Sequence, residues 1–107
     1  MQFDSLAPEA QAFLRAMAAK YIWWKPPEEA VLWVERLCAQ VMTLGEYEDI
    51  QDLDRLIGEA SLCHVIDAAE AGWFNMRSWV YWHRRLALSP PGFSNEGVPA
   101  LPVRKFR

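Results

Sequence analysis

Apolar residues recur along most of this chain at intervals of three and four, the spacing that places side chains on one face of an α-helix. Glycine and proline interrupt the pattern several times, and each interruption separates one helix from the next. The sequence therefore predicts an all-α fold, a compact bundle of about five short helices. These helices cover residues 8–21, residues 27–43, a short stretch around 50–57, residues 60–70 and a last stretch that begins after Asn75.

The second predicted helix, residues 27–43, has the clearest amphipathic pattern in the chain. We expect a single helix that ends at Gly45 and keeps its apolar side in the core. This apolar arc contains Ala30, Val31, Trp33, Val34, Leu37, Cys38, Val41 and Leu44.

The last predicted helix has two different faces. Asn75 can accept a hydrogen bond at its N-cap, and Phe74 can pack on Trp79 as a hydrophobic staple. The face predicted to be core holds Met76, Trp79, Val80, Trp82, His83 and Leu86. The opposite, basic and aromatic face is a candidate partner-binding surface and holds Arg77, Tyr81, Arg84 and Arg85.

Two adjacent tryptophans, Trp23 and Trp24, lie between the first two predicted helices, where Pro26 and Pro27 end the first one. Because neighbouring side chains do not easily point the same way, we expect one indole to enter the core and the other to lie at the surface. Tryptophan is enriched among the residues that dominate binding interfaces. Trp24 is therefore a candidate partner contact.

Composition and charge indicate one folded domain with a different C-terminal end. The chain has 107 residues, 52% hydrophobic and 13% aromatic, which is typical of a globular domain. Residues 1–88 carry eight basic and thirteen acidic residues, a net charge of −5, whereas residues 89–107 carry three and one, a net charge of +2. The absence of a membrane-length apolar run or a signal-peptide pattern predicts a cytoplasmic protein.

The C-terminal segment, residues 89–107, holds four of the seven prolines and is predicted to be an extended arm. Its apolar residues among basic ones resemble anchors for a groove on a partner. The alternative is a loose tail, as many termini are. The candidate contacts in this arm are Leu101, Arg104 and Phe106.

Residues capable of catalysis or metal binding do not form a recognisable set. Cys38 and Cys63 lack zinc-ligand spacing and are predicted to be reduced thiols. His64 falls on a solvent face, whereas His83 falls among the core aromatics and needs a hydrogen-bond partner there. The acidic residues near the third helix are predicted to be solvated, or else to dock a basic surface of a partner. We therefore expect no enzyme activity, no cofactor and no metal site.

Three passages combine aromatic residues with helix boundaries: Lys20-Tyr21-Ile22-Trp23-Trp24-Lys25, Gln40-Val41-Met42 to Leu44-Gly45, and Phe74-Asn75 to Ser78-Trp79 with Tyr81-Trp82-His83. Together they resemble a family of small bacterial proteins. Its members look like the products encoded beside nucleotidyltransferase-fold toxins of the abortive-infection AbiEii type, for which they would be the antitoxins. The resemblance covers about residues 12–88, and the chain departs from it at Pro26, where a Thr or Ser would cap the second helix.

The resemblance implies a nucleotidyltransferase-fold toxin as the protein partner, and an acidic body with a basic helix face and arm fits a protein-binding module without catalysis. The alternative is a nucleic-acid-binding transcriptional regulator that uses the same basic face with aromatic stacking. A helix-turn-helix reader built on residues 60–70 is disfavoured because the outer face of that helix has no Lys or Arg. Affinity that falls steeply with salt would distinguish nucleic-acid binding from protein binding.

Overall fold

The computed structural model describes residues 2–86, and over that range the chain forms helices and no strands. The predicted all-α fold is confirmed. The predicted arm, residues 89–107, lies outside the described residues. The elements are η1 (Phe3–Ser5), α1 (Pro8–Tyr21), α2 (Pro27–Ala30), α3 (Val34–Leu44), α4 (Tyr47–Ile57), α5 (Glu59–Asp67) and α6 (Met76–Arg85).

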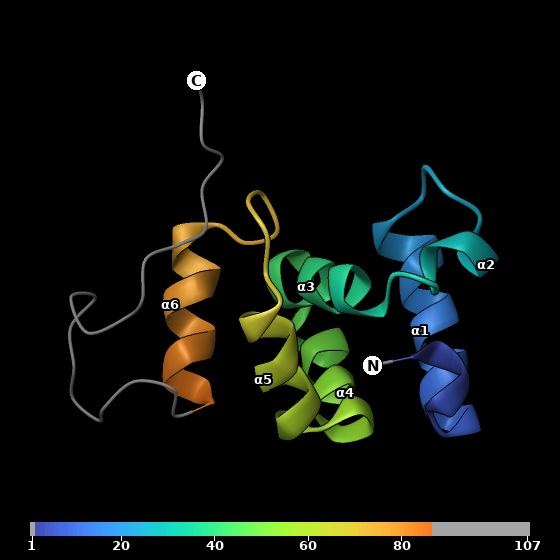
Figure 1. Cartoon of the computed structure of the whole chain (residues 1–107), viewed down its shortest axis with the longest axis horizontal. Coiled ribbons are helices and arrows are strands. Elements are labelled where there is room, and N and C mark those ends of the chain that lie inside the picture. Colours follow the sequence, from blue (N-terminus) through green and yellow to red (C-terminus); the bar gives the residue numbers. More distant parts are fainter. Residues whose placement is uncertain (1, 87–107) are drawn as a thin grey trace.

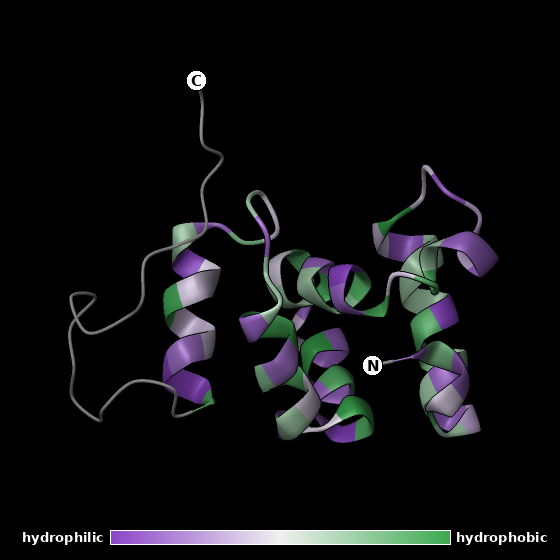
Figure 2. Cartoon of the chain, viewed as in Figure 1, coloured by the Kyte–Doolittle hydropathy of each residue, from purple (hydrophilic) through white to green (hydrophobic). Residues whose placement is uncertain are grey.

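Helix α3 is the centre of the bundle and is in contact with α1, α4, α5 and α6. Figure 1 shows α1 and α6 at opposite sides of the molecule, with α3, α4 and α5 between them. Figure 2 shows hydrophobic and hydrophilic residues interleaved along α1, α3 and α4, as expected for amphipathic helices around one core. The largest fully buried side chains come from five helices and are Leu14, Val34, Leu37, Cys38, Val41, Leu53, Leu62, Val65 and Trp82.

The prediction of one helix over residues 27–43 is wrong, because the chain divides there into α2 and α3. The N–H of Leu32 bonds the Glu29 carbonyl at 3.2 Å and the N–H of Trp33 bonds the Ala30 carbonyl at 3.1 Å, three residues back in each case. Aromatic and β-branched residues are weak helix formers, which makes this stretch easy to interrupt. The interruption allows α2 to lie against α1 while α3 crosses the middle of the molecule (Figure 1).

Two large side chains predicted on the buried arc of that helix are instead exposed. Trp33 precedes α3 with non-helical dihedral angles and is 60% exposed, and Leu44, the last residue of α3, is 58% exposed. Pro26 occupies the N-cap of α2 without a side-chain hydrogen bond, so the expected Thr or Ser cap has no counterpart here.

Helix α6 begins as the sequence predicts. The Asn75 side chain accepts a hydrogen bond from the Ser78 N–H at 2.8 Å, and the Phe74 and Trp79 rings lie 5.5 Å apart. Trp79 and Trp82 are buried, which confirms that this face of α6 belongs to the core. Met76, predicted on the same face, is 53% exposed, since it opens the helix and neighbouring elements cover it only in part.

A hydrogen-bonded network joins the end of α1 to the start of α4. The Lys20 ammonium lies 2.7 Å from the Asp49 carboxylate, and the Tyr21 hydroxyl donates to the same oxygen at 2.6 Å. The Glu46 N–H in turn donates to the Tyr21 hydroxyl at 3.0 Å. The prediction that the acidic residues here are simply solvated is therefore wrong for Asp49, whose side chain is only 15% exposed.

Candidate functional site

The described part of the chain has no group of three or more His, Cys, Asp or Glu residues arranged to hold a metal ion. None of its helices is both long and apolar enough to cross a membrane. Cys38 and Cys63 are free thiols, and burial raises the pKa of Cys38 to about 12. A thiol that remains protonated at neutral pH is a poor nucleophile.

Of the two histidines, His83 is buried and His64 is exposed, as predicted. The Nδ1 of His83 donates to the Trp79 carbonyl oxygen at 2.7 Å, and the two rings lie 4.3 Å apart. A carbonyl can only accept a hydrogen bond, so Nδ1 must carry the proton. The expected hydrogen-bonded core histidine is confirmed. The exposed His64 lies 3.4 Å from the Glu35 carboxylate.

The basic face predicted on the last helix is present on α6, and we call it the α6 basic face. Its aromatic member, Tyr81, is 49% exposed and stands edge-on to the buried Trp82 ring at 5.2 Å. Arg85 pairs with Asp54 and thereby also ties α6 to α4. This face has a shallow hollow, which is lined by Arg77, Val80, Tyr81, Arg84 and Arg85.

The prediction that one of the two adjacent tryptophans enters the core is wrong. Trp23 is 77% exposed and Trp24 is 53% exposed, with their rings edge-on at 5.7 Å. Ile22 occupies the core position instead and is 5% exposed. After Ile22 the chain turns, with the Lys25 N–H bonded to the Ile22 carbonyl at 3.2 Å, and this turn directs both indoles outward.

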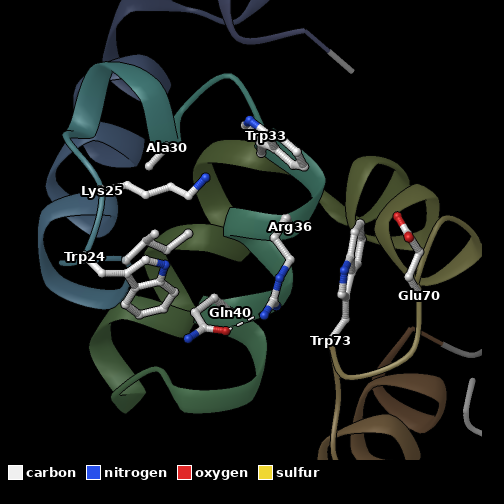
Figure 3. A pocket seen from close by; sticks show the side chains of 9 residues that line it. Trp24, Lys25, Ala30, Trp33, Arg36, Gln40, Glu70 and Trp73 are labelled. Carbon is white, nitrogen blue, oxygen red and sulfur yellow. Dashed lines mark hydrogen bonds between the residues drawn. The ribbon is translucent and has the colours of Figure 1, made fainter. Parts of the chain in front are cut away.

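A pocket of about 290 Å³ lies where three segments meet, and we call it the tryptophan pocket. Figure 3 shows its aromatic walls: Trp24 from the turn between α1 and α2, Trp33 from the break between α2 and α3, and Trp73 from the loop before α6. The remaining lining residues are Ile22, Lys25, Ala30, Arg36, Gln40 and Glu70.

Local turns hold two of these walls in place. Trp33 is fixed by the break between α2 and α3, which brings its backbone out of the helix. The loop before α6 turns at Trp73, whose N–H bonds the Glu70 carbonyl at 3.1 Å and whose carbonyl accepts from the Thr43 hydroxyl at 3.2 Å. The amphipathic pattern of residues 27–43 did not reveal this pocket, because it places Trp33 on the buried face. The signal available in the sequence was the presence of Trp23 and Trp24, Trp33 and Trp73 in three of the segments that separate helices.

The two cations in the pocket interact with its indole rings. The Lys25 ammonium lies 5.2 Å from the centre of the Trp33 ring, and the Arg36 guanidinium lies 5.8 Å from that of Trp73. Both distances fall within the range of cation–π attraction. Arg36 also donates to the Gln40 side-chain oxygen at 3.2 Å. Partial burial lowers the pKa of Arg36, because it removes water from the charged group.

The predicted contact residues therefore fall into separate places. Arg77, Tyr81, Arg84 and Arg85 come together on α6, whereas Trp24 belongs to the segment between α1 and α2, at the other end of the molecule (Figure 1). The arm residues Leu101, Arg104 and Phe106 lie outside the described range. Comparison of the chain with protein-family models, with curated proteins and with solved structures finds no match.

Proposed function

We propose that this chain is a protein-binding module without catalytic activity of its own. The observation that carries the proposal is the exposure of three tryptophans, Trp23, Trp24 and Trp33, in a chain of this size. Large aromatic side chains that remain in water are unfavourable for a small domain and are typical of surfaces that another protein covers.

The charge of the molecule supports a protein rather than a nucleic acid as the partner. Residues 1–88 have a net charge of −5, which opposes binding to a phosphate backbone. The α6 basic face is a local exception, and such a patch suits an acidic region on a protein surface.

For the partner, we propose a nucleotidyltransferase-fold toxin encoded beside this chain, which the chain neutralises by direct binding as an antitoxin. This identity rests on the resemblance of the passages around Tyr21, Val41 and Trp79 to the antitoxin family. In this structure two of these passages include structural contacts: Tyr21 bonds Asp49, and Trp79 packs on Phe74. The surfaces left for the toxin are the α6 basic face, the exposed tryptophans and the arm.

The test is coexpression of the tagged chain with the products of the adjacent genes, followed by affinity purification and a binding measurement. We expect the toxin to copurify and its toxicity to be suppressed. The double variant Arg77→Glu/Arg84→Glu should weaken binding at least about tenfold, since it reverses two charges at the contact. Arg15→Glu is the matched control, because Arg15 is an exposed arginine on α1, on the side of the molecule opposite α6 (Figure 1).

Three results would overturn the proposal. If no product of the adjacent genes binds the chain, or if no nucleotidyltransferase-fold gene adjoins it, the antitoxin assignment is wrong. If the chain instead binds DNA or RNA with an affinity that falls steeply as salt rises, the nucleic-acid-binding regulator is the correct function. Deletion of residues 89–107 tests the arm separately, since unchanged affinity for the toxin would exclude it as a contact.

A further inference from the structure

The tryptophan pocket contains a cation whose hydrogen-bonding capacity is largely unused. A guanidinium has five N–H donors. In the described part of the chain, Arg36 makes one side-chain hydrogen bond, to the neutral amide of Gln40 at 3.2 Å. No described carboxylate lies within the 4.0 Å that defines an ion pair with it. Arg36 is therefore poised to receive an anion.

The position of Arg36 favours a carboxylate in particular. Its guanidinium carbon lies 5.8 Å from the centre of the Trp73 ring, a cation–π contact that keeps the group at the wall of the pocket. A planar guanidinium held in this way can bind a carboxylate through two parallel hydrogen bonds. Figure 3 shows Trp73 between Arg36 and Glu70, the one acidic residue that lines the pocket. Glu70 acts on Arg36 through space, but in the described part of the chain no ion pair joins the two side chains. The guanidinium is thus left to pair with a carboxylate of another molecule.

The walls beside Arg36 suit an aromatic or large aliphatic side chain. Trp24 and Trp33 are 53% and 60% exposed, so each retains apolar area that a ligand could cover. Ile22 and Ala30 are buried beneath them and provide an apolar floor. The volume of about 290 Å³ is large enough for one such side chain but small for a whole drug-sized ligand.

We propose that the tryptophan pocket binds a segment of a protein partner in which a Glu or Asp is adjacent to a large apolar side chain, with the carboxylate on Arg36 and the apolar group between the indoles. This inference rests on the proposed protein-binding function and names one contact within it. This surface is distinct from the α6 basic face. Because it prefers an acidic ligand, it is not suited to the chain's own C-terminal segment, which has a net charge of +2.

A nucleotide would also combine a flat ring with negative charge, but the charges around the pocket disfavour it. The second cation of the pocket, Lys25, lies 3.8 Å from Glu29, which offsets its charge. Glu70 adds a further negative charge at the rim. A phosphate monoester carries more negative charge than a carboxylate, so these acidic neighbours oppose it more strongly than they oppose a single Glu or Asp side chain.

The probe for the test is the capped peptide Gly-Phe-Glu-Gly, titrated into the ¹⁵N-labelled full chain while the indole N–H signals are recorded. We expect the signals of Trp24, Trp33 and Trp73 to shift together and to saturate. The Trp82 signal should not move, because its indole N–H is bonded to the Met42 carbonyl inside the core at 2.9 Å. Single Trp→Phe variants assign the signals.

Matched peptides and variants test the role of the charge. The Gln and Lys counterparts of the peptide should bind roughly tenfold or more weakly, because they cannot form the charged pair with Arg36. Arg36→Gln should weaken the Glu peptide by a similar factor. Arg55→Gln is the control, since Arg55 is an exposed arginine on α4 that does not line the pocket.

Several outcomes would overturn the inference. The absence of shifts at peptide concentrations up to about 10 mM would exclude the pocket as a peptide site. Equal binding of the Glu and Gln peptides would exclude Arg36 as the anion contact. Tighter binding of adenosine monophosphate than of the peptide would assign the pocket to a nucleotide. If the toxin copurifies while the peptide fails, only the pocket is rejected and the protein-binding function stands.

Discussion

The contact between Trp82 and the end of α3 gives the sharpest test of how the fold is held together. Trp82 is fully buried, and its indole N–H donates to the carbonyl of Met42 at 2.9 Å. We therefore expect Trp82→Phe, which keeps an aromatic ring but removes the donor, to destabilise the chain strongly.

The reason lies in the last turn of α3, where backbone carbonyls have no partner within the helix. The Gly45 N–H donates to the carbonyl of Val41 at 2.7 Å. The Glu46 N–H, four residues after Met42, donates instead to the Tyr21 hydroxyl. The Met42 carbonyl therefore receives its hydrogen bond from a different helix, α6, through the indole. Removing that donor leaves a buried acceptor unsatisfied.

The expected loss can be estimated from two contributions. An unsatisfied buried carbonyl costs about 1–3 kcal/mol. The smaller ring of phenylalanine also leaves about three atoms' worth of empty space in the core, which costs about 1–2 kcal/mol. Trp82→Phe should therefore lower the free energy of unfolding by roughly 2–5 kcal/mol, and Trp82→Ala by about 3–5 kcal/mol or more.

Urea unfolding followed by far-ultraviolet circular dichroism measures this change without depending on tryptophan fluorescence. Trp24→Phe is the matched control, because Trp24 is 53% exposed and the same substitution there should change the free energy by no more than about 0.5 kcal/mol. If the two variants differ from one another by less than about 0.5 kcal/mol at unchanged m-value, the indole bond to Met42 does not stabilise the fold as argued.

Three further predictions concern other parts of the chain. Gly58 joins α4 to α5 at φ 91° and ψ 153°, a conformation nearly restricted to glycine, so Gly58→Ala should cost about 1–3 kcal/mol in thermal unfolding, and a neutral effect would contradict this. Hydrogen bonds, first from Lys20, hold the pKa of Asp49 below its usual value. The contribution of Asp49 to stability should thus be complete above about pH 4, the unfolded value, and be lost as pH falls through the lower folded pKa. The difference in melting temperature between the wild type and Asp49→Asn should accordingly close in acid, and a constant difference would refute the argument. Burial raises the pKa of Cys38 to about 12, so in a thiol-reagent titration at neutral pH Cys38 should react only after unfolding in urea, whereas the partly exposed Cys63 should react slowly in the native chain.

Local sequence signals were sufficient to predict those helix ends that are determined by the residues at the end itself. Pro8 opens α1, and Asn75 caps α6 through the Ser78 N–H, so both starts were predicted correctly. A glycine interruption likewise predicts the boundary between α4 and α5, and the structure places Gly58 there at φ 91°. In each case the deciding interactions involve residues close together in the chain, so they can be read from the sequence.

The break between α2 and α3 could not be predicted in this way. The pattern over residues 27–43 fits one helix, and both arrangements bury Ala30 and Val34. What decides between them is how α2 packs against α1, a contact between segments distant in the chain. The tryptophan pocket depends on that break for Trp33 and on a turn after α5 for Trp73, so it exists only once the tertiary structure has formed.

The tryptophans of this chain show why composition alone does not define a site. A buried indole must satisfy its N–H as well as fill space. Trp82 meets both conditions through the Met42 carbonyl, and it lies in the core. Trp23, Trp24 and Trp33 lie on turns between helices, where the described part of the chain leaves more than half of each side chain uncovered. Because these indoles add little to the packing of the bundle, a contact with another molecule is the physical role that their chemistry and position best fit.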